Sequence, residues 1–223
     1  MTIRQSPVKI FLAGKQHKEA PPALGDLLRM DDEWLVAGQT VEYRVQSTAW
    51  LIVLPLTGAL EFFSTAAGHV RLTAAHVWVL PLASGETYTI RNTSGLHHAG
   101  YLQLLLQREA IWPVAVPALA DYNLDRFMNV LMKIAVKTEP VSPAGWQLSI
   151  GKFSANAETS YHTRDKKNGL FVFVIEGLFD VQGRLLQARD ALAIWDTSSV
   201  RATALRQDAV LLTIECPLTS SFH

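Results

Sequence analysis

The stretch PLASGETYTIRN (81–92) holds the side chain whose spacing most suggests chemistry in this chain. A proline, a glycine and an asparagine frame Tyr88, in a pattern typical of a loop that leads into a strand of a metal-binding barrel. Two histidines placed two residues apart on a strand would point to one face and could share a metal. No His-x-His occurs anywhere in the chain. A lone tyrosine makes a poor metal site, and a core tyrosine with a hydrogen-bonded hydroxyl is the simpler interpretation.

The other reactive side chains form no recognisable metal-binding or catalytic pattern. Cys216 is the single cysteine, so neither an internal disulfide nor a cysteine-rich zinc site can form. His97 and His98 are adjacent in a glycine-bounded loop, and sequence neighbours rarely face one metal together. The chain has no G-x-S-x-G elbow, no P-loop and no dinucleotide fingerprint.

Composition excludes several classes of protein. The chain has 223 residues, of which 49% are hydrophobic, so it can form a large core. Lysine plus arginine equals aspartate plus glutamate at 20 each, and without a basic block we expect no direct nucleic-acid binding. Apolar runs such as AWLIVLPL are far shorter than the ~20 residues of a membrane helix, so we expect no membrane insertion. With no apolar signal core at the N-terminus, we expect a cytoplasmic protein.

Strand patterns dominate. TVEYRVQ (40–46) alternates, with Val41, Tyr43 and Val45 on one face and Glu42, Arg44 and Gln46 on the other. WLIVLPL (50–56) is apolar on both faces, as expected of a strand buried on both sides. In contrast, residues 123–137 carry apolar side chains at helical spacing, and prolines and a glycine follow at 138–145. The middle of the chain therefore predicts an amphipathic helix in a linker.

The two halves repeat. LIVLPLTGALEF (51–62) matches LFVFVIEGLFDV (170–181), with glycine at the eighth place of both. Further along, AAHVWVLP (74–81) matches ARDALAIW (188–195). Two copies of one β-unit predict tandem barrels. We expect an N-terminal barrel over residues 1–120, a helix-containing linker over 121–145 and a C-terminal barrel over 146–223.

These repeated stretches resemble cupins, and the pair resembles the pirin-like bicupins over residues 24–217. The resemblance implies an all-β fold of two tandem cupin barrels, each a double-stranded β-helix or jelly roll, joined by the linker. Counted back from Gly58, the family's His-x-His positions fall on Arg44 and Gln46. Its glutamate position falls on Leu51 or Trp50, and its second-motif histidine on Tyr88.

The metal ligands of the first barrel are thus replaced, and the second barrel carries Leu170 at its glutamate position. We therefore expect no metal and no cofactor. An arginine at a ligand position repels cations and needs a partner or an anion when it is buried. One hypothesis is a small-anion pocket lined by Glu42, Arg44, Gln46, Trp50 and Tyr88. The alternative is a barrel filled by its own side chains.

Three functions stay open at this point. The first is a non-enzymatic protein that binds a small ligand or regulates a protein partner, as the resemblance implies for some pirin-like proteins. The second is a metal-dependent, quercetinase-like dioxygenase with atypical ligands. The third is a metal-free enzyme of the isomerase type, with Tyr88 or Glu42 as acid or base. The many apolar strand faces would serve either the contact between the barrels or a homodimer.

Overall fold

The computed structural model describes residues 8–11, 25–107, 117–135 and 145–218. Within these ranges the chain forms strands and turns and no helix, in agreement with the predicted all-β class. A helix long and apolar enough to cross a membrane is accordingly not found in the described ranges.

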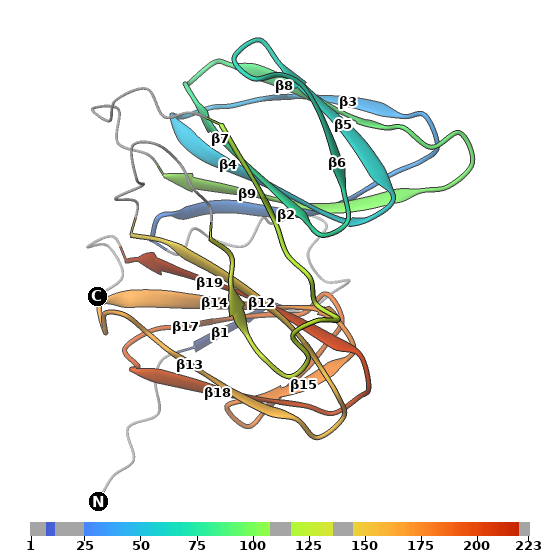
Figure 1. The fold of residues 1–223 in the computed structure, drawn as a ribbon. Coiled ribbons are helices and arrows are strands. Elements are labelled where there is room, and N and C mark those ends of the chain that lie inside the picture. The colour runs from blue at the N-terminus through green and yellow to red at the C-terminus, as the bar shows by residue number, and fades with distance from the viewer. Residues whose placement is uncertain (1–7, 12–24, 108–116, 136–144, 219–223) are drawn as a thin grey trace, which may run out of the picture. The chain divides into compact units, whose positions relative to one another are not determined.

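The first barrel is built from two antiparallel sheets (Figure 1). One has the strand order β10-β7-β4-β9-β2 and the other the order β3-β8-β5-β6. Apart from the β5–β6 hairpin, strands that are neighbours in space are not consecutive in sequence, as in a jelly roll. The strands are β2 (Leu27–Leu35), β3 (Thr40–Arg44), β4 (Ala49–Thr57), β5 (Ala59–Ser64), β6 (Gly68–Thr73), β7 (His76–Leu82), β8 (Thr87–Asn92), β9 (Ala99–Gln107) and β10 (Ala118–Asp121).

The second barrel repeats this arrangement with the sheets β1-β17-β14-β19-β12-β11 and β13-β18-β15-β16. Its strands are β1 (Val8–Phe11), β11 (Met132–Lys133), β12 (Gln147–Phe153), β13 (Glu158–His162), β14 (Asn168–Glu176), β15 (Leu178–Val181), β16 (Arg184–Gln187), β17 (Ala191–Ile194), β18 (Ser199–Ala204) and β19 (Ala209–Pro217). The predicted all-β fold of two tandem barrels is therefore confirmed.

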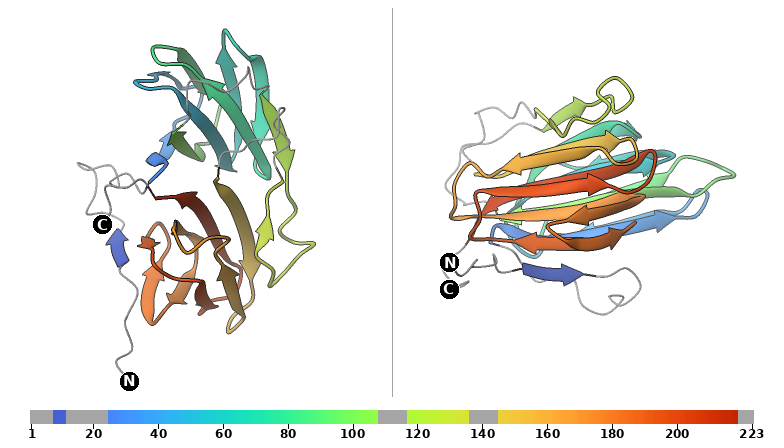
Figure 2. Two further views of the ribbon diagram at one scale, coloured as in Figure 1. Left: turned by 90° about the vertical axis from the view of Figure 1, so that its left-hand side faces the viewer. Right: turned by 90° about the horizontal axis from the view of Figure 1, so that it is seen from below.

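The N-terminal strand departs from the predicted boundaries. β1 pairs with β17, so that Val8 lies opposite Ile194 and Phe11 opposite Ala191. Figure 2 shows this strand, in blue, beside the orange strands of the second barrel. The assignment of residues 1–120 to the first barrel thus fails at its start, because an isolated N-terminal strand can extend the exposed edge of either sheet.

The predicted linker helix is also wrong for the described residues 123–135, which form turns and the short strand β11. Asn129 has a φ of +62°, which ends any right-handed helix there. Its N–H donates to the Lys152 carbonyl at 2.8 Å, and the Ile134 N–H donates to Leu148 at 2.9 Å. The backbone therefore bonds to β12 rather than to itself. Residues 136 and 137 of the predicted helix lie outside the described ranges.

The sequence repeat corresponds to a repeat of strained turns. Gly58 and Gly177 have φ values of +77° and +86°. A Cβ on Gly58 would lie 2.9 Å from the Ala99 Cβ, and one on Gly177 would lie 2.6 Å from the Ala209 Cβ. Glycine is therefore required at both turns, by backbone conformation and by the close approach of a neighbouring strand.

The turn before β7 and the turn before β17 also correspond. His76 Nδ1 accepts the Thr73 N–H at 3.1 Å, and Asp190 Oδ2 accepts the Gln187 N–H at 3.0 Å. Asp190 therefore has the structural turn role expected of an acidic residue at this place.

Each barrel encloses its own apolar core. Alternate residues of β4, such as Leu51 and Val53, belong to the core of the first barrel, while Ile52 between them is buried on the opposite face. The prediction that this strand is buried on both faces is confirmed. In the second barrel, Leu170 and Val172 of β14 occupy the corresponding core positions.

Candidate functional site

Side chains along β3 and the two residues after it alternate between the core and the surface, and this alternation separates the predicted pocket residues. Val45 belongs to the core of the first barrel, and Tyr43 packs against that core. Glu42, Arg44 and Gln46 are exposed, since they alternate with these inward-facing residues. The predicted internal arginine therefore lies on the outer surface of the barrel.

Of the remaining two pocket residues, only Tyr88 lies in the barrel core. Trp50 is buried, but it stands between Ala49 and Leu51, which both belong to the core, so it lies on the other face of β4. The five residues consequently do not line one pocket. Counting back from Gly58 crosses the β3–β4 connection, where a difference of one residue turns every side chain of β3 to the opposite face.

An aromatic stack occupies the core where the second-motif ligand was expected. The Tyr88 ring stacks on Tyr43 with centroids 5.1 Å apart and on Phe62 at 5.5 Å. Phe62 in turn meets Trp78 edge-on at 6.2 Å. Tyr88, Phe62 and Trp78 are each at most 6% exposed. Of the two hypotheses for this barrel, the geometry supports the one in which its own side chains fill it.

Two hydrogen bonds cross the first barrel from β3 and β8 to β9. The hydroxyls of Tyr43 and Tyr101 are 2.5 Å apart, and either can donate. The Tyr88 hydroxyl donates to Gln103 Oε1 at 2.8 Å. Tyr43 and Tyr88 are cross-strand neighbours, so the two bonds lie side by side and tie the sheets together. We call these two bonds the crossbars.

Burial sets the protonation of the crossbar tyrosines. It raises the pKa of Tyr88 well above the ordinary phenol value, and it raises the pKa of Tyr101 further, with a contribution from the hydrogen bond to Tyr43. The pKa of Tyr43 is also raised, chiefly by desolvation. All three groups therefore stay neutral phenols at physiological pH and act as hydrogen-bonding groups, not as bases.

Two carboxylates on β2 stand beside the crossbars. Asp31 and Glu33 alternate with the core residue Leu35 and lie opposite Gln103 and Tyr101 on β9. Both are only partly exposed. Burial, followed by the nearby Asp31 carboxylate, raises the pKa of Glu33.

Asp31 is itself neutralised by Arg29, whose Nε lies 2.8 Å from Oδ1. Sequence reasoning does not predict that Asp31 and Glu33 lie together at this place. The alternation of DDEWL with Leu35 indicates their shared face, but a bulge between Leu27 and Arg29 interrupts the pattern earlier in the strand.

The crossbar region does not fit the metal that the cupin resemblance implies. First-row metals prefer imidazole, thiolate or carboxylate ligands. The inward-facing oxygens here belong to protonated phenols and an amide, and of the two nearby carboxylates Asp31 is paired with Arg29. Among the described residues, no group of three histidine, cysteine, aspartate or glutamate side chains could hold a metal ion.

The second barrel carries a corresponding tyrosine. Tyr161, on β13, donates to Glu215 Oε2 of β19 at 2.7 Å, as Tyr43 of β3 bonds to β9 in the first barrel. Glu215 is fully buried, and it also accepts the Asn168 amide at 2.6 Å and the Arg164 N–H at 2.8 Å. Burial would raise the pKa of Glu215, but the hydrogen bonds from Asn168 and Tyr161 outweigh it and hold the pKa below its usual value.

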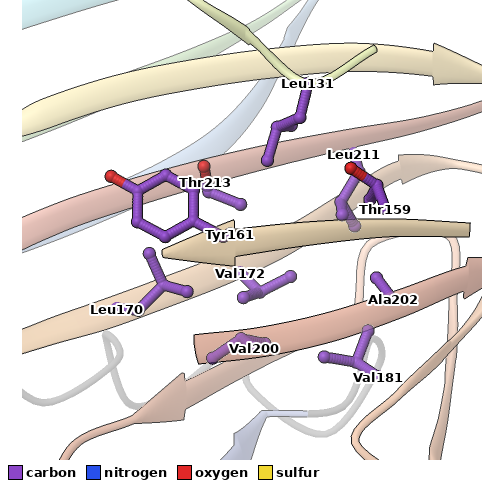
Figure 3. Close-up of a pocket in the computed structure, with 10 residues that line it drawn as sticks. All are labelled: Leu131, Thr159, Tyr161, Leu170, Val172, Val181, Val200, Ala202, Leu211 and Thr213. Atoms are coloured by element: carbon purple, nitrogen blue, oxygen red, sulfur yellow. The ribbon is translucent and has the colours of Figure 1, made fainter. Parts of the chain in front are cut away.

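A small cavity lies beside Tyr161 inside the second barrel (Figure 3). Its volume is about 10 Å³, room for about one water molecule, and its lining is mostly aliphatic, including Leu170 and Val172. The buried Thr213 hydroxyl in its wall has no hydrogen-bond partner in the described structure. Such a space suits an ordered water and cannot hold an organic substrate.

The second barrel matches a known protein family. Residues 145–216 match the model of the family described as "Quercetinase C-terminal cupin domain". No curated protein sequence matches the chain.

Solved structures share the fold of the whole chain at low sequence identity. YhhW from Escherichia coli superposes with a TM-score of 0.75 at 14% identity, covering 95% of this chain and 92% of that chain. The bacterial pirin YhhW from Escherichia coli in complex with nickel(II) gives 0.66 at 12% identity, with 95% and 93% covered. Quercetin 2,3-dioxygenase from Acinetobacter baumannii gives 0.71 at 11% identity, with 96% and 75% covered.

The family match and the shared topology agree with each other and with the repeated turns described above. At these identities the structural neighbours show the fold and not the activity. The chain folds as two cupin barrels, as the bacterial pirin YhhW does, and its second barrel is similar to the quercetinase C-terminal cupin domain.

Proposed function

We propose that this protein acts by binding, as a ligand-binding or regulatory protein, and not by metal-dependent dioxygenation. The crossbars carry the proposal. A cupin dioxygenase needs imidazole or carboxylate ligands around an open coordination position. In this chain the corresponding space is occupied by the stacked rings of Tyr43, Tyr88 and Phe62.

The placement of the histidines supports the same proposal. His69, His97, His98 and His162 are exposed, and His76 uses Nδ1 to accept a backbone N–H at the turn before β7. None of these five side chains belongs to the core cluster that holds the crossbar tyrosines.

The test is oxygen consumption with quercetin as substrate. The untagged full chain would be produced separately with nickel, iron, manganese, cobalt and copper, with the Acinetobacter baumannii quercetin dioxygenase as a positive control. We expect rates no higher than those of the free metal salts. Saturable turnover that scales with protein concentration would overturn the proposal.

A further inference from the structure

The outer face of the second barrel holds a hollow that the proposed function does not use. It lies over β13, β18 and β15 and has a volume of about 380 Å³, within the range of small-ligand sites. Its lining is polar and contains no aromatic side chain. The strands beneath it turn their apolar residues, such as Tyr161 and Val200, into the core, so their polar residues face outward.

The pairing of the strands arranges these polar side chains in two rows. In the first row, Thr203 of β18 has Glu158 on one side and Asp180 on the other. In the second row, Arg201 of β18 lies beside Ser160. The rows are two residues apart along β18, which separates the Cα atoms of Thr203 and Arg201 by about 7 Å. Negative charge therefore flanks one end of the hollow and positive charge stands at the other.

Among the described residues, the charged side chains that line the hollow form no ion pair with one another. In the part of the chain that the structure describes, no hydrogen bond or ion pair engages the side chains of Glu158 or Arg201. Asp180 uses one oxygen, Oδ1, to accept the Gly183 N–H at 2.7 Å, which leaves its other oxygen available. The wall thus offers a guanidinium and two carboxylates that remain apart although they line one hollow.

We propose that this hollow binds a small zwitterion, an extended molecule with an ammonium group at one end and a carboxylate at the other, that spans the two rows. The carboxylate would pair with Arg201, which suits a planar anion. The ammonium would lie between Glu158 and Asp180, with the Ser160 and Thr203 hydroxyls accepting or donating around the ligand. A purely anionic ligand would face two carboxylates, and a purely cationic one would face the arginine. The site goes beyond the proposed function, since it would stand even if the first barrel proved catalytic.

The experiment is an NMR titration of the ¹⁵N-labelled full chain with 6-aminohexanoate. Its extended chain carries the two charges at opposite ends. Glycine, hexanoate and hexylamine are the comparison probes, with a short charge separation or a single charge. We expect saturable shifts confined to β13, β18 and β15 with 6-aminohexanoate, and about fivefold weaker binding of each comparison probe, as loss of one exposed ion pair predicts.

Variants locate the site. Arg201→Gln and Glu158→Gln should each weaken 6-aminohexanoate about fivefold, since each removes one exposed ion pair. Arg206→Gln, an exposed arginine outside the hollow, should leave the affinity unchanged. Unaltered spectra away from the substitution would show that each variant is folded. The proposal is overturned if hexanoate or hexylamine binds as well as 6-aminohexanoate, if the shifts fall elsewhere, or if none saturate.

Discussion

The hydroxyl groups of Tyr43 and Tyr101 meet at 2.5 Å across the first barrel, joining β3 to β9. Beside them Tyr88 bonds to Gln103, so two hydrogen bonds connect the two sheets at one level. A barrel core is normally held by dispersion and by the hydrophobic effect alone. Here two hydrogen-bonded pairs inside the core also fix how the sheets face each other.

Removing one partner of the Tyr88–Gln103 crossbar should destabilise the protein. Tyr88→Phe leaves Gln103 Oε1 without its donor in a residue only 2% exposed, which should cost about 1–3 kcal/mol. Tyr88→Phe combined with Gln103→Leu replaces both partners by apolar groups and should recover most of that loss. Urea denaturation of the three proteins measures both effects. Equal stabilities of Tyr88→Phe and the parent would show that the bond contributes nothing.

The acid sensitivity of the second barrel should depend on Glu215. The pKa of Glu215 in the folded protein lies below 4.5, the usual value for a glutamate, so the carboxylate stabilises the fold fully above that pH. This stabilisation is lost as the pH falls through the folded-state pKa. Glu215→Gln should cost about 1–3 kcal/mol at pH 7, because an amide cannot accept from all of its donors.

The measurement is the melting temperature of the parent and of Glu215→Gln between pH 7 and pH 3. The difference between the two melting temperatures should narrow below about pH 4.5, the usual pKa of a glutamate. Glu176→Gln, an exposed glutamate at the end of β14, serves as the control and should follow the parent. A gap that stays constant with pH would be incompatible with a stabilising ionised Glu215.

A side chain at the repeated glycine turns should destabilise the fold. Gly58→Ala combines a φ of +77° with a Cβ only 2.9 Å from the Ala99 Cβ, and should cost about 1–3 kcal/mol. Gly38→Ala is the matched control in the same barrel, with a φ of +72° and open space around its Cβ. It should cost only about 1 kcal/mol. Thermal denaturation compares the two, and equal losses would refute a role for the close contact.

The repeat and the strand patterns were readable from the sequence because each rests on local rules. Gly58 and Gly177 mark equivalent turns, and the period of two in β3 placed Val41, Tyr43 and Val45 on one face. That alternation already conflicted with an internal Arg44. The pocket hypothesis followed the family spacing instead, and it failed because the length of the β3–β4 connection sets the register.

Other features could not be read from the sequence because they depend on distant partners. The apolar residues of 123–135 have helical spacing, but the backbone bonds to β12 and Asn129 adopts a left-handed conformation. Asp31 and Glu33 become neighbours of Tyr101 only through the pairing of β2 with β9. Contacts of this kind depend on tertiary pairing, which local patterns do not specify.

Metal content tests the central claim most directly. The untagged chain and its His97→Ala/His98→Ala variant would be exposed to nickel and iron, desalted and analysed by mass spectrometry for bound metal. The variant removes the exposed histidine pair as a source of surface binding. The closed first barrel predicts far less than one metal ion per chain in the variant. The account would be contradicted if that variant bound one metal ion per chain and if a further substitution of Tyr88 abolished this binding.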